Sequence, residues 1–266
     1  GVIPYLHGLA LDAEDALDTR ALSKTESKIR VAVLALARIS NHNDFDPLRL
    51  HPQIDFHWVG PGEAIPPVDL IIIPGSKNSC ADLHFLRQQH WDQGIARHLR
   101  YGGKLIGICG GMQMLGESIS DPEGIEGPIV KALGLGYLPL RTELRGNKIL
   151  RQREGVLWDG VTQVKGYEIH CGISEGQGLA RPVILFSDDN SQTDGAISTD
   201  NQVLGTYLHG LFDQPEACNA ILRWCGLDNF AALNLEQMRE QSLELLAASV
   251  VEAVDLTLAG LEPQQN

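Results

Sequence analysis

The first half of the chain alternates between short apolar runs and longer polar stretches. The apolar runs are rich in β-branched and aliphatic residues, a pattern typical of strands that are buried on both faces of a parallel sheet. They occupy residues 29–36, 54–59, 69–73 and 104–108, and a helix-compatible stretch at 79–100 separates the last two. Alternating buried strands and helices predict an α/β fold with a doubly wound, largely parallel sheet and flanking helices.

The second half contains shorter strand candidates that are separated by turns of Gly, Asp and Asn. After Pro128 these candidates are residues 161–169, 182–186, 195–198 and 203–208. We expect them to extend or flank the first sheet. Helices are expected at 214–225 and 235–258, and the apolar residues of the second recur at roughly helical spacing.

Changes in this pattern divide the chain into three parts. Residues 1–28 open with a strand-like stretch at 1–5 and continue into polar, acidic residues, so they are interpreted as a linker with a strand remnant. Residues 29–227 carry the predicted α/β domain. Residues 228–266 are expected to form a C-terminal helical extension.

Composition indicates an ordinary globular protein and argues against several other classes. Of 266 residues, 43% are apolar and 21% are charged, close to typical values for globular domains. No apolar run reaches the roughly 18 residues of a membrane span, and residues 1–20 do not resemble a secretory signal. We therefore expect a cytoplasmic protein without a membrane partner. The net charge of −13 repels phosphate backbones, so no nucleic-acid partner is expected.

The five cysteines are an odd number, and none forms a Cys-x-x-Cys pair. This pattern predicts neither a disulfide framework nor a metal site. One cysteine differs from the others in its sequence context, because it lies between an apolar strand and an apolar-periodic helix.

That residue is Cys109, in the segment Gly-Ile-Cys-Gly-Gly-Met-Gln-Met-Leu-Gly at 107–116. A nucleophile on a sharp strand-to-helix turn needs glycines around it, because the backbone is strained and the substrate must approach closely. The N-terminus of the following helix favours the thiolate, and the N–H of Gly110 is expected to face a developing oxyanion. The competing interpretation is a buried structural cysteine, but the flanking glycines favour a nucleophile.

A second glycine turn, Pro-Gly-Ser-Lys-Asn-Ser at 74–79, follows the strand at 69–73. It also lies at the carboxyl end of a predicted parallel strand, where the ligand sites of such sheets collect. The backbone N–H groups of Gly75 and Ser76 are expected to supply a second oxyanion donor. The phosphate-loop pattern Gly-x-x-x-x-Gly-Lys-Ser/Thr does not occur in the sequence, which argues against an ATP site here.

A cysteine nucleophile needs a histidine that is near in space and usually distant in sequence. His209 is the first candidate, because it follows the apolar strand at 203–208 and precedes a glycine. His170 is the rival, and sequence spacing alone does not separate the two.

The segment Gly-Ile-Cys-Gly-Gly-Met-Gln at 107–113 resembles the nucleophile elbow of class I, triad-type glutamine amidotransferases, which have a flavodoxin-like fold. In that family a Gln four residues after the cysteine helps to hold the substrate glutamine, and Gln113 has this position. More narrowly, the chain from residue 1 to about 227 resembles the C-terminal half of the cobyric acid synthase family. The motifs that carry this resemblance are Val-Asp-Leu-Ile-Ile-Ile-Pro-Gly-Ser-Lys-Asn-Ser (68–79), Lys-Gly-Tyr-Glu-Ile-His-Cys-Gly (165–172) and Gly-Thr-Tyr-Leu-His-Gly-Leu-Phe-Asp (205–213).

The resemblance implies a glutaminase domain whose ammonia serves the ATP-dependent amidation of four corrin-ring carboxylates. In that family an ATP-binding half precedes this region, so the chain is expected to be an isolated domain. Its implied partners are glutamine, the missing N-terminal ATP-binding domain and the corrinoid substrate of that domain. ATP and magnesium would be bound only by the other half, and no cofactor is expected in this chain.

One position departs from the wider family pattern, because the Glu expected two residues after the catalytic histidine is replaced by Leu211. The resemblance accounts for this gap, which cobyric acid synthases and cobyrinic acid diamide synthases share. Glu168 and Asp213 are candidates to orient His209, although Asp213 also suits the cap of the helix at 214 and Glu168 the α-amino group of glutamine. We expect that no dedicated carboxylate orients His209 and that backbone groups and water hold its imidazole ring. A slow basal glutaminase activity is the expected consequence.

Other functions stay open on the sequence alone. A related synthase, such as the diamide synthase or an amidotransferase acting on a cell-wall intermediate, would use the same chemistry. A Cys-dependent hydrolase or protease of similar fold would use the elbow without needing Gln113. A non-catalytic subunit would keep the elbow only as part of a binding surface.

Overall fold

The computed structural model describes residues 2–6, 9, 28–187, 192–227 and 235–254. The chain divides into two compact units, one made of Gly1–Leu17 with Leu233–Asn266 and the other of Asp18–Ala232. The second unit contains every residue that the sequence singled out for chemistry. Among the described residues, no helix is both long enough and apolar enough to cross a membrane.

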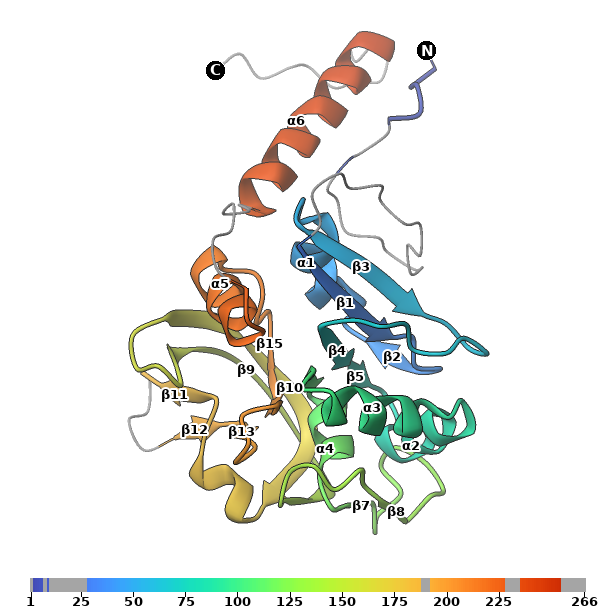
Figure 1. Cartoon of the computed structure of the whole chain (residues 1–266). Coiled ribbons are helices and arrows are strands. Elements are labelled where there is room, and N and C mark those ends of the chain that lie inside the picture. The colour runs from blue at the N-terminus through green and yellow to red at the C-terminus, as the bar shows by residue number, and fades with distance from the viewer. Residues whose placement is uncertain (1, 7–8, 10–27, 188–191, 228–234, 255–266) are drawn as a thin grey trace. The chain divides into compact units, whose positions relative to one another are not determined.

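The second unit is built around a six-stranded sheet with the order β13-β14-β6-β4-β1-β3. Its strands are β1 (Ile29–Leu34), β3 (Ile54–Val59), β4 (Leu70–Ile73), β6 (Lys104–Ile108), β13 (Ala196–Ile197) and β14 (Val203–Thr206). Two neighbours in this sheet, β1 and β3, lie side by side in Figure 1. All neighbours pair in parallel except β13, which is antiparallel to β14. The four apolar runs of the first half are therefore parallel strands, as predicted, and the α/β fold is confirmed.

Parallel pairing places the carboxyl ends of β1, β4, β6 and β14 at the same edge of this sheet. Four connections leave the sheet at that edge. They lead to the 3₁₀ helix η1 (His42–Phe45), to β5 (Gly75–Ser76), to α4 (Gly110–Leu115) and to β15 (Leu208–His209). Segments up to 165 residues apart in sequence, from Asp44 to His209, are brought together in this way.

Helices follow the strands as the alternating pattern predicts. They are α1 (Asp46–Leu50), α2 (Ser79–Gln88), α3 (Trp91–Arg100) and α5 (Pro215–Trp224). Helix α2 is capped by Asn78, whose side-chain oxygen accepts a 2.9 Å hydrogen bond from the N–H of Ala81, the usual way to satisfy a free N–H at a helix start. Helices α2 and α3 divide the stretch 79–100, which the sequence left as one helix-compatible connection.

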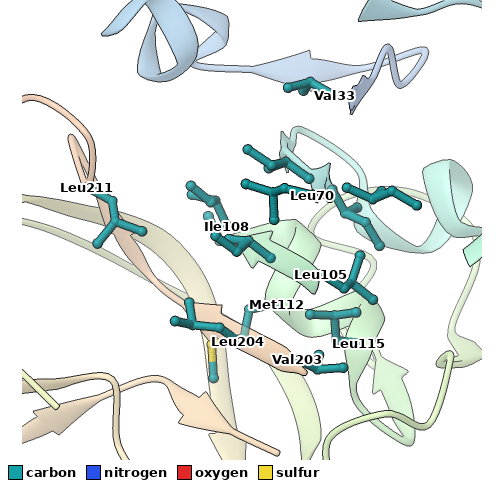
Figure 2. Close-up of a cluster of buried hydrophobic side chains, with 14 of the residues drawn as sticks. Val33, Leu70, Leu105, Ile108, Met112, Leu115, Val203, Leu204 and Leu211 are labelled. Carbon is teal, nitrogen blue, oxygen red and sulfur yellow. The ribbon is translucent and has the colours of Figure 1, made fainter. Parts of the chain in front are cut away.

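One part of the buried core of this unit, drawn in Figure 2, joins strands of the first sheet to helix α4. Ile108 and Leu105 of β6 and Met112 of α4 are completely buried there, with Leu204 of β14. Removing such a side chain leaves a cavity that typically costs about 2–5 kcal/mol, since tightly packed neighbours relax only partly. Strand β6 and helix α4, which lie on either side of Cys109, are therefore held by tightly packed side chains.

A second, mostly antiparallel sheet has the order β12-β11-β9-β10-β15, with β7 and β8 beside β9. Its strands are β7 (Ser118–Ser120), β8 (Lys131–Leu133), β9 (Arg141–Leu157), β10 (Gln163–Glu175), β11 (Ile184–Phe186), β12 (Thr193–Asp194) and β15. The expected strands at 161–169 and 182–186 belong to this sheet, whereas those at 195–198 and 203–208 extend the first. Strand β9 was not predicted, because its central residues are mostly polar and exposed and lack a sustained apolar run.

Three smaller elements complete the description. Strand β2 (Ile39–Ser40) pairs with β5, so Gly75 and Ser76 are in a short strand and not in the expected turn. A second 3₁₀ helix, η2, spans Gln177–Ala180. In the first unit, helix α6 (Leu235–Ala253) confirms most of the helix expected at 235–258, whose last four residues lie outside the described part.

Residues 2–6 take neither helical nor strand structure, so the strand-like stretch expected at residues 1–5 is not paired with another strand in the described part of the chain. An extended segment becomes a strand only through hydrogen bonds to a neighbouring strand, which its apolar composition cannot supply by itself. Most of the linker predicted for residues 6–28 lies outside the described residues.

Candidate active site

Cys109 connects β6 to α4 with backbone angles φ 52° and ψ −110°, which are rare for a residue with a side chain. Such conformations cost about 1–3 kcal/mol and persist where the surrounding packing fixes them. The glycines around it are required for space. A Cβ on Gly107 would lie 2.7 Å from the backbone of Gly111, and a Cβ on Gly111 would lie 2.0 Å from the carbonyl oxygen of Ile73. The predicted strand-turn-helix elbow is present.

His209 lies on β15 and is completely buried. Its Nδ1 is 2.6 Å from Oδ2 of Asp44, and Oδ1 of Asp44 accepts a 3.2 Å hydrogen bond from the N–H of Gly210. The Asp44 carboxylate thus holds both the ring and the backbone that follows it. With Nδ1–H donated to Asp44, Nε2 is the nitrogen available for proton transfer, and it makes no hydrogen bond to another nitrogen or oxygen among the described residues.

The charge of His209 depends on these neighbours. Burial by itself lowers the pKa of His209, but the hydrogen bond and negative charge of Asp44, together with the adjacent Cys109 sulfur, raise that pKa to about 10. At neutral pH the ring is therefore protonated. An imidazolium beside a sulfur stabilises the thiolate, which is the nucleophilic form of cysteine.

The expectation that no dedicated carboxylate orients His209 is wrong, because Asp44 does so. The two carboxylates considered from the sequence have other positions. Glu168 accepts a 2.7 Å hydrogen bond from Nε of Arg151 and lies 3.9 Å from Nε2 of His170. The carboxylate of Asp213 lies against the backbone of Gly210. The N-cap residue of α5 is Gln214 and not Asp213. A slow basal glutaminase therefore no longer follows from a missing third residue.

Sequence reasoning missed Asp44 because nothing near it marks chemistry. It lies in η1, a short polar connection 165 residues before His209. The one usable signal is that this connection leaves the carboxyl end of the first parallel strand, the edge where the other site residues also collect.

Tyr167 is a second residue of the site that the sequence did not suggest. Its ring stacks on His209 with centroids 5.2 Å apart and planes 17° apart. Its hydroxyl accepts a 2.6 Å hydrogen bond from Nδ2 of Asn41. Gly166 is required beside it, because a Cβ there would lie 2.0 Å from the carbonyl oxygen of His209. The imidazole is thus held by Asp44 at its edge and by Tyr167 on its face.

The proposed oxyanion donors are brought to the same place. A Cβ on Gly110 would lie 2.9 Å from the backbone nitrogen of Ser76, so the two peptide groups are neighbours. A Cβ on Gly75 would lie 3.3 Å from Cε1 of His209. The hydroxyl of Ser76 donates a 2.7 Å hydrogen bond to Asp82, which assigns its side chain to the support of this loop. The backbone at Gly110, after β6, and the backbone at Gly75 and Ser76, after β4, therefore lie side by side near His209.

The last two residues predicted for the site, Gln113 and His170, both contact Tyr207. Gln113 is buried one helical turn after Cys109, and its Nε2 is 3.5 Å from the hydroxyl of Tyr207. The ring of His170 stacks on Tyr207 at 3.9 Å, and its Nδ1 is 2.8 Å from the carbonyl oxygen of Gly172. His209, with its carboxylate partner, is thus the histidine that fits the role of proton carrier.

Comparison with known proteins agrees with this geometry. The model of the CobB/CobQ-like glutamine amidotransferase domain matches residues 30–217. The chain belongs to the CobB/CobQ-like glutamine amidotransferase family. The match covers all six strands of the first sheet from Arg30 onward, together with the elbow and His209.

Two solved structures align with most of this chain. PurLQS from Thermotoga maritima aligns with a TM-score of 0.52 and 16% identity, over 81% of this chain and 99% of that chain. A structure described as a glutamine amidotransferase aligns with a TM-score of 0.53 and 19% identity, over 74% of this chain and 99% of that one. At these identities the likeness concerns the fold.

A metal centre has no support among the described residues, where no group of three or more His, Cys, Asp or Glu side chains is arranged to hold an ion.

Cys109 should react with iodoacetamide near neutral pH faster than the other four cysteines. Burial raises the pKa of Cys80 to about 11 and that of Cys218 to about 12, and it also raises the pKa values of Cys171 and Cys225. Those thiols stay protonated and react slowly, whereas the sulfur of Cys109 lies at the start of α4 beside His209, the kind of setting in which cysteines are reactive. Peptide mapping of carbamidomethylation over time measures the order, and earlier modification of Cys171 would contradict this assignment.

Proposed function

We propose that this chain is the glutaminase domain of a cobyric acid synthase, which hydrolyses glutamine and supplies ammonia for amidation of corrin-ring carboxylates. The observation that supports the glutaminase step most directly is the Asp44–His209 pair beside Cys109 in a member of the CobB/CobQ-like family. The narrower corrinoid role rests on the resemblance of the segments 68–79, 165–172 and 205–213.

In the first half of the reaction the Cys109 thiolate attacks the side-chain amide carbon of glutamine and forms a C–S bond. The carbonyl oxygen becomes an oxyanion, which the backbone N–H groups of Gly110 and the Gly75–Ser76 segment stabilise. The imidazolium of His209 donates its Nε2 proton to the amide nitrogen, and the C–N bond breaks. Ammonia leaves, and a γ-glutamyl thioester remains on Cys109.

In the second half, neutral His209 takes a proton from water at Nε2, and the resulting hydroxide attacks the thioester. Collapse of the second tetrahedral intermediate releases glutamate and restores the thiolate–imidazolium pair. Asp44 holds Nδ1 throughout, so the same ring nitrogen gives and receives the proton.

Ammonia formed here is consumed by a partner that activates a carboxylate with ATP. The family partner is a synthase domain, and for a cobyric acid synthase its substrate is a corrinoid. The whole reaction is then that of a ligase that forms carbon–nitrogen bonds with glutamine as the nitrogen donor.

The test of the proposed function is release of glutamate from glutamine by the purified chain, alone and with the ATP-binding half of a cobyric acid synthase. Glutamine hydrolysis with corrinoid amidation in the mixture supports the full proposal. The corrinoid role would be replaced if the chain hydrolysed glutamine but supported amidation only of a cell-wall intermediate, in a mixture with the synthase for that intermediate. Hydrolysis of peptides in preference to glutamine would replace the amidotransferase role with that of a hydrolase.

The purified 266-residue chain should show no ATP binding by calorimetry, with or without magnesium. The sequence contains no Gly-x-x-x-x-Gly-Lys-Ser/Thr loop to cradle phosphates. Added ammonia should likewise fail to support corrinoid amidation, because the activation of the carboxylate is the step that requires the other domain. ATP binding by this chain would contradict the assignment of activation to a partner.

A further inference from the structure

The side-chain amide of Gln113 is held at one end only. Its Nε2 donates to the hydroxyl of Tyr207 at 3.5 Å, whereas its Oε1 is buried and has no hydrogen-bond partner among the described residues. A buried acceptor without a donor costs about 1–3 kcal/mol. Native structures rarely keep such a group unless a ligand or water satisfies it.

Tyr207 is itself held by a chain of hydroxyl groups. Its hydroxyl is 2.7 Å from Oγ of Ser174, which is 2.7 Å from Oγ1 of Thr142. Burial raises the pKa of Tyr207 to about 12, so the phenol keeps its proton. Because the phenolic oxygen accepts from Nε2 of Gln113, this proton is available for a hydrogen bond to Oγ of Ser174.

The ring of Tyr207 is fixed by His170, the motif residue for which the catalytic mechanism has no use. The two rings stack at 3.9 Å, and the ring of His170 is fixed in turn by the carbonyl oxygen of Gly172. Gly172 also leaves room for Gln113, because a Cβ there would lie 2.4 Å from Nε2 of Gln113. The segment 168–174 of β10 thus supports one side chain of α4.

We propose that Tyr207, supported by Ser174 and His170, is a positioning residue that fixes the amide of Gln113 so that its free Oε1 accepts a hydrogen bond from the α-ammonium group of substrate glutamine. This inference rests on the proposed glutaminase function. The backbone N–H of Gln113 donates a 3.2 Å hydrogen bond to the carbonyl oxygen of Cys109, so Gln113 lies within one helical turn of the nucleophile and is suited to bind the substrate beside the reacting carbon. A free carbonyl oxygen selects a ligand cation, whereas a free amide N–H would select a carboxylate.

The experiment uses covalent trapping of Cys109 by 6-diazo-5-oxo-L-norleucine, a glutamine analogue, followed by mass spectrometry. The inactivation constant KI and the limiting rate are measured for the wild type and for Tyr207→Phe. We expect KI to rise roughly tenfold in the variant, the size of effect that loss of one hydrogen bond to a charged group produces. The limiting rate and the rate with iodoacetamide should stay close to those of the wild type.

A second probe, 6-diazo-5-oxohexanoate, lacks the α-amino group. If Oε1 of Gln113 binds the ammonium, Tyr207→Phe should leave KI for this probe unchanged. In a Gln113→Leu background, Tyr207→Phe should have no further effect on either probe, because it acts through Gln113. Ser174→Ala should change KI in the same direction by a smaller factor, which also tests the proposal if Tyr207→Phe does not fold.

The matched control is Tyr101→Phe, a tyrosine at the end of α3 that is 83% exposed. It should match the wild type in every measurement. An unchanged KI in both Tyr207→Phe and Ser174→Ala would overturn the positioning role, and an equal rise in KI for both probes would overturn the recognition of the ammonium. Failure of the wild type to be trapped at Cys109 would instead contradict the proposed glutaminase function itself.

Discussion

Cys109→Ser should reduce glutamine hydrolysis by about five to six orders of magnitude while the protein stays folded. The hydroxyl of serine has a pKa far above that of a thiol, and the site is built to stabilise a thiolate beside the protonated His209. Serine is close in size to cysteine, so the strained elbow and its packing are kept. Glutamate release measured by a coupled assay, with thermal unfolding as the check on folding, gives the result.

The matched controls for this variant are Cys171→Ser and Cys80→Ser. Cys171 lies two residues after Ile169, whose carbonyl oxygen is 3.5 Å from the Cys109 sulfur, and Cys80 is a buried helix residue of α2. Both variants should keep near-normal turnover. Glutaminase activity that survives Cys109→Ser but disappears with either control would rule out Cys109 as the nucleophile.

Asp44→Asn should lower turnover by about 10³- to 10⁴-fold with little change in KM. An amide in place of the carboxylate removes the negative charge that stabilises the imidazolium, and it favours the wrong tautomer of the ring, as in other triads. Comparison with Glu168→Gln and Asp213→Asn makes the test specific, because neither of those carboxylates is assigned to His209. A loss of turnover in Glu168→Gln or Asp213→Asn as large as that in Asp44→Asn would argue against a unique role for Asp44.

The same variant has a signature in the pH dependence of stability. In the folded wild type the pKa of His209 is raised to about 10, above the value of 6.5 for a free imidazole. A raised pKa contributes stability that is fully present below pH 6.5 and is lost as the pH rises through 10. The difference in free energy of unfolding between the wild type and Asp44→Asn should therefore shrink as the pH rises across this window. Chemical denaturation at several pH values measures it.

Local sequence patterns were sufficient for the sheet that carries the site. Each of the four apolar runs of the first half became a parallel strand because a segment buried on both faces has to be apolar along its whole length. The elbow at Cys109 was equally visible, since close approach of α4 to β4 and β6 requires glycines at fixed positions. His209 was found as a residue that ends an apolar strand.

Other features depended on contacts that no local pattern encodes. Strand β9 consists largely of polar and charged residues, and it is a strand because β10 pairs with it over most of its length. The short strand at Gly75 and Ser76 exists because β2 lies beside it. Pairing of this kind depends on the partner strand and not on the apolar content of the segment itself.

The residues around His209 show most clearly which features the sequence predicted and which the tertiary structure decided. The sequence alone determined the fold class, through its apolar strands. It also singled out Cys109 and His209 as the candidate nucleophile and proton carrier, because each lies at the end of such a strand. Only the tertiary structure decided that Asp44 orients His209, that Tyr167 covers its ring and that His170 supports Tyr207 instead. The physical reason is that hydrogen bonds and ring contacts are fixed by side-chain direction in space, and Asp44 meets His209 only after β1 and β14 have joined the same sheet.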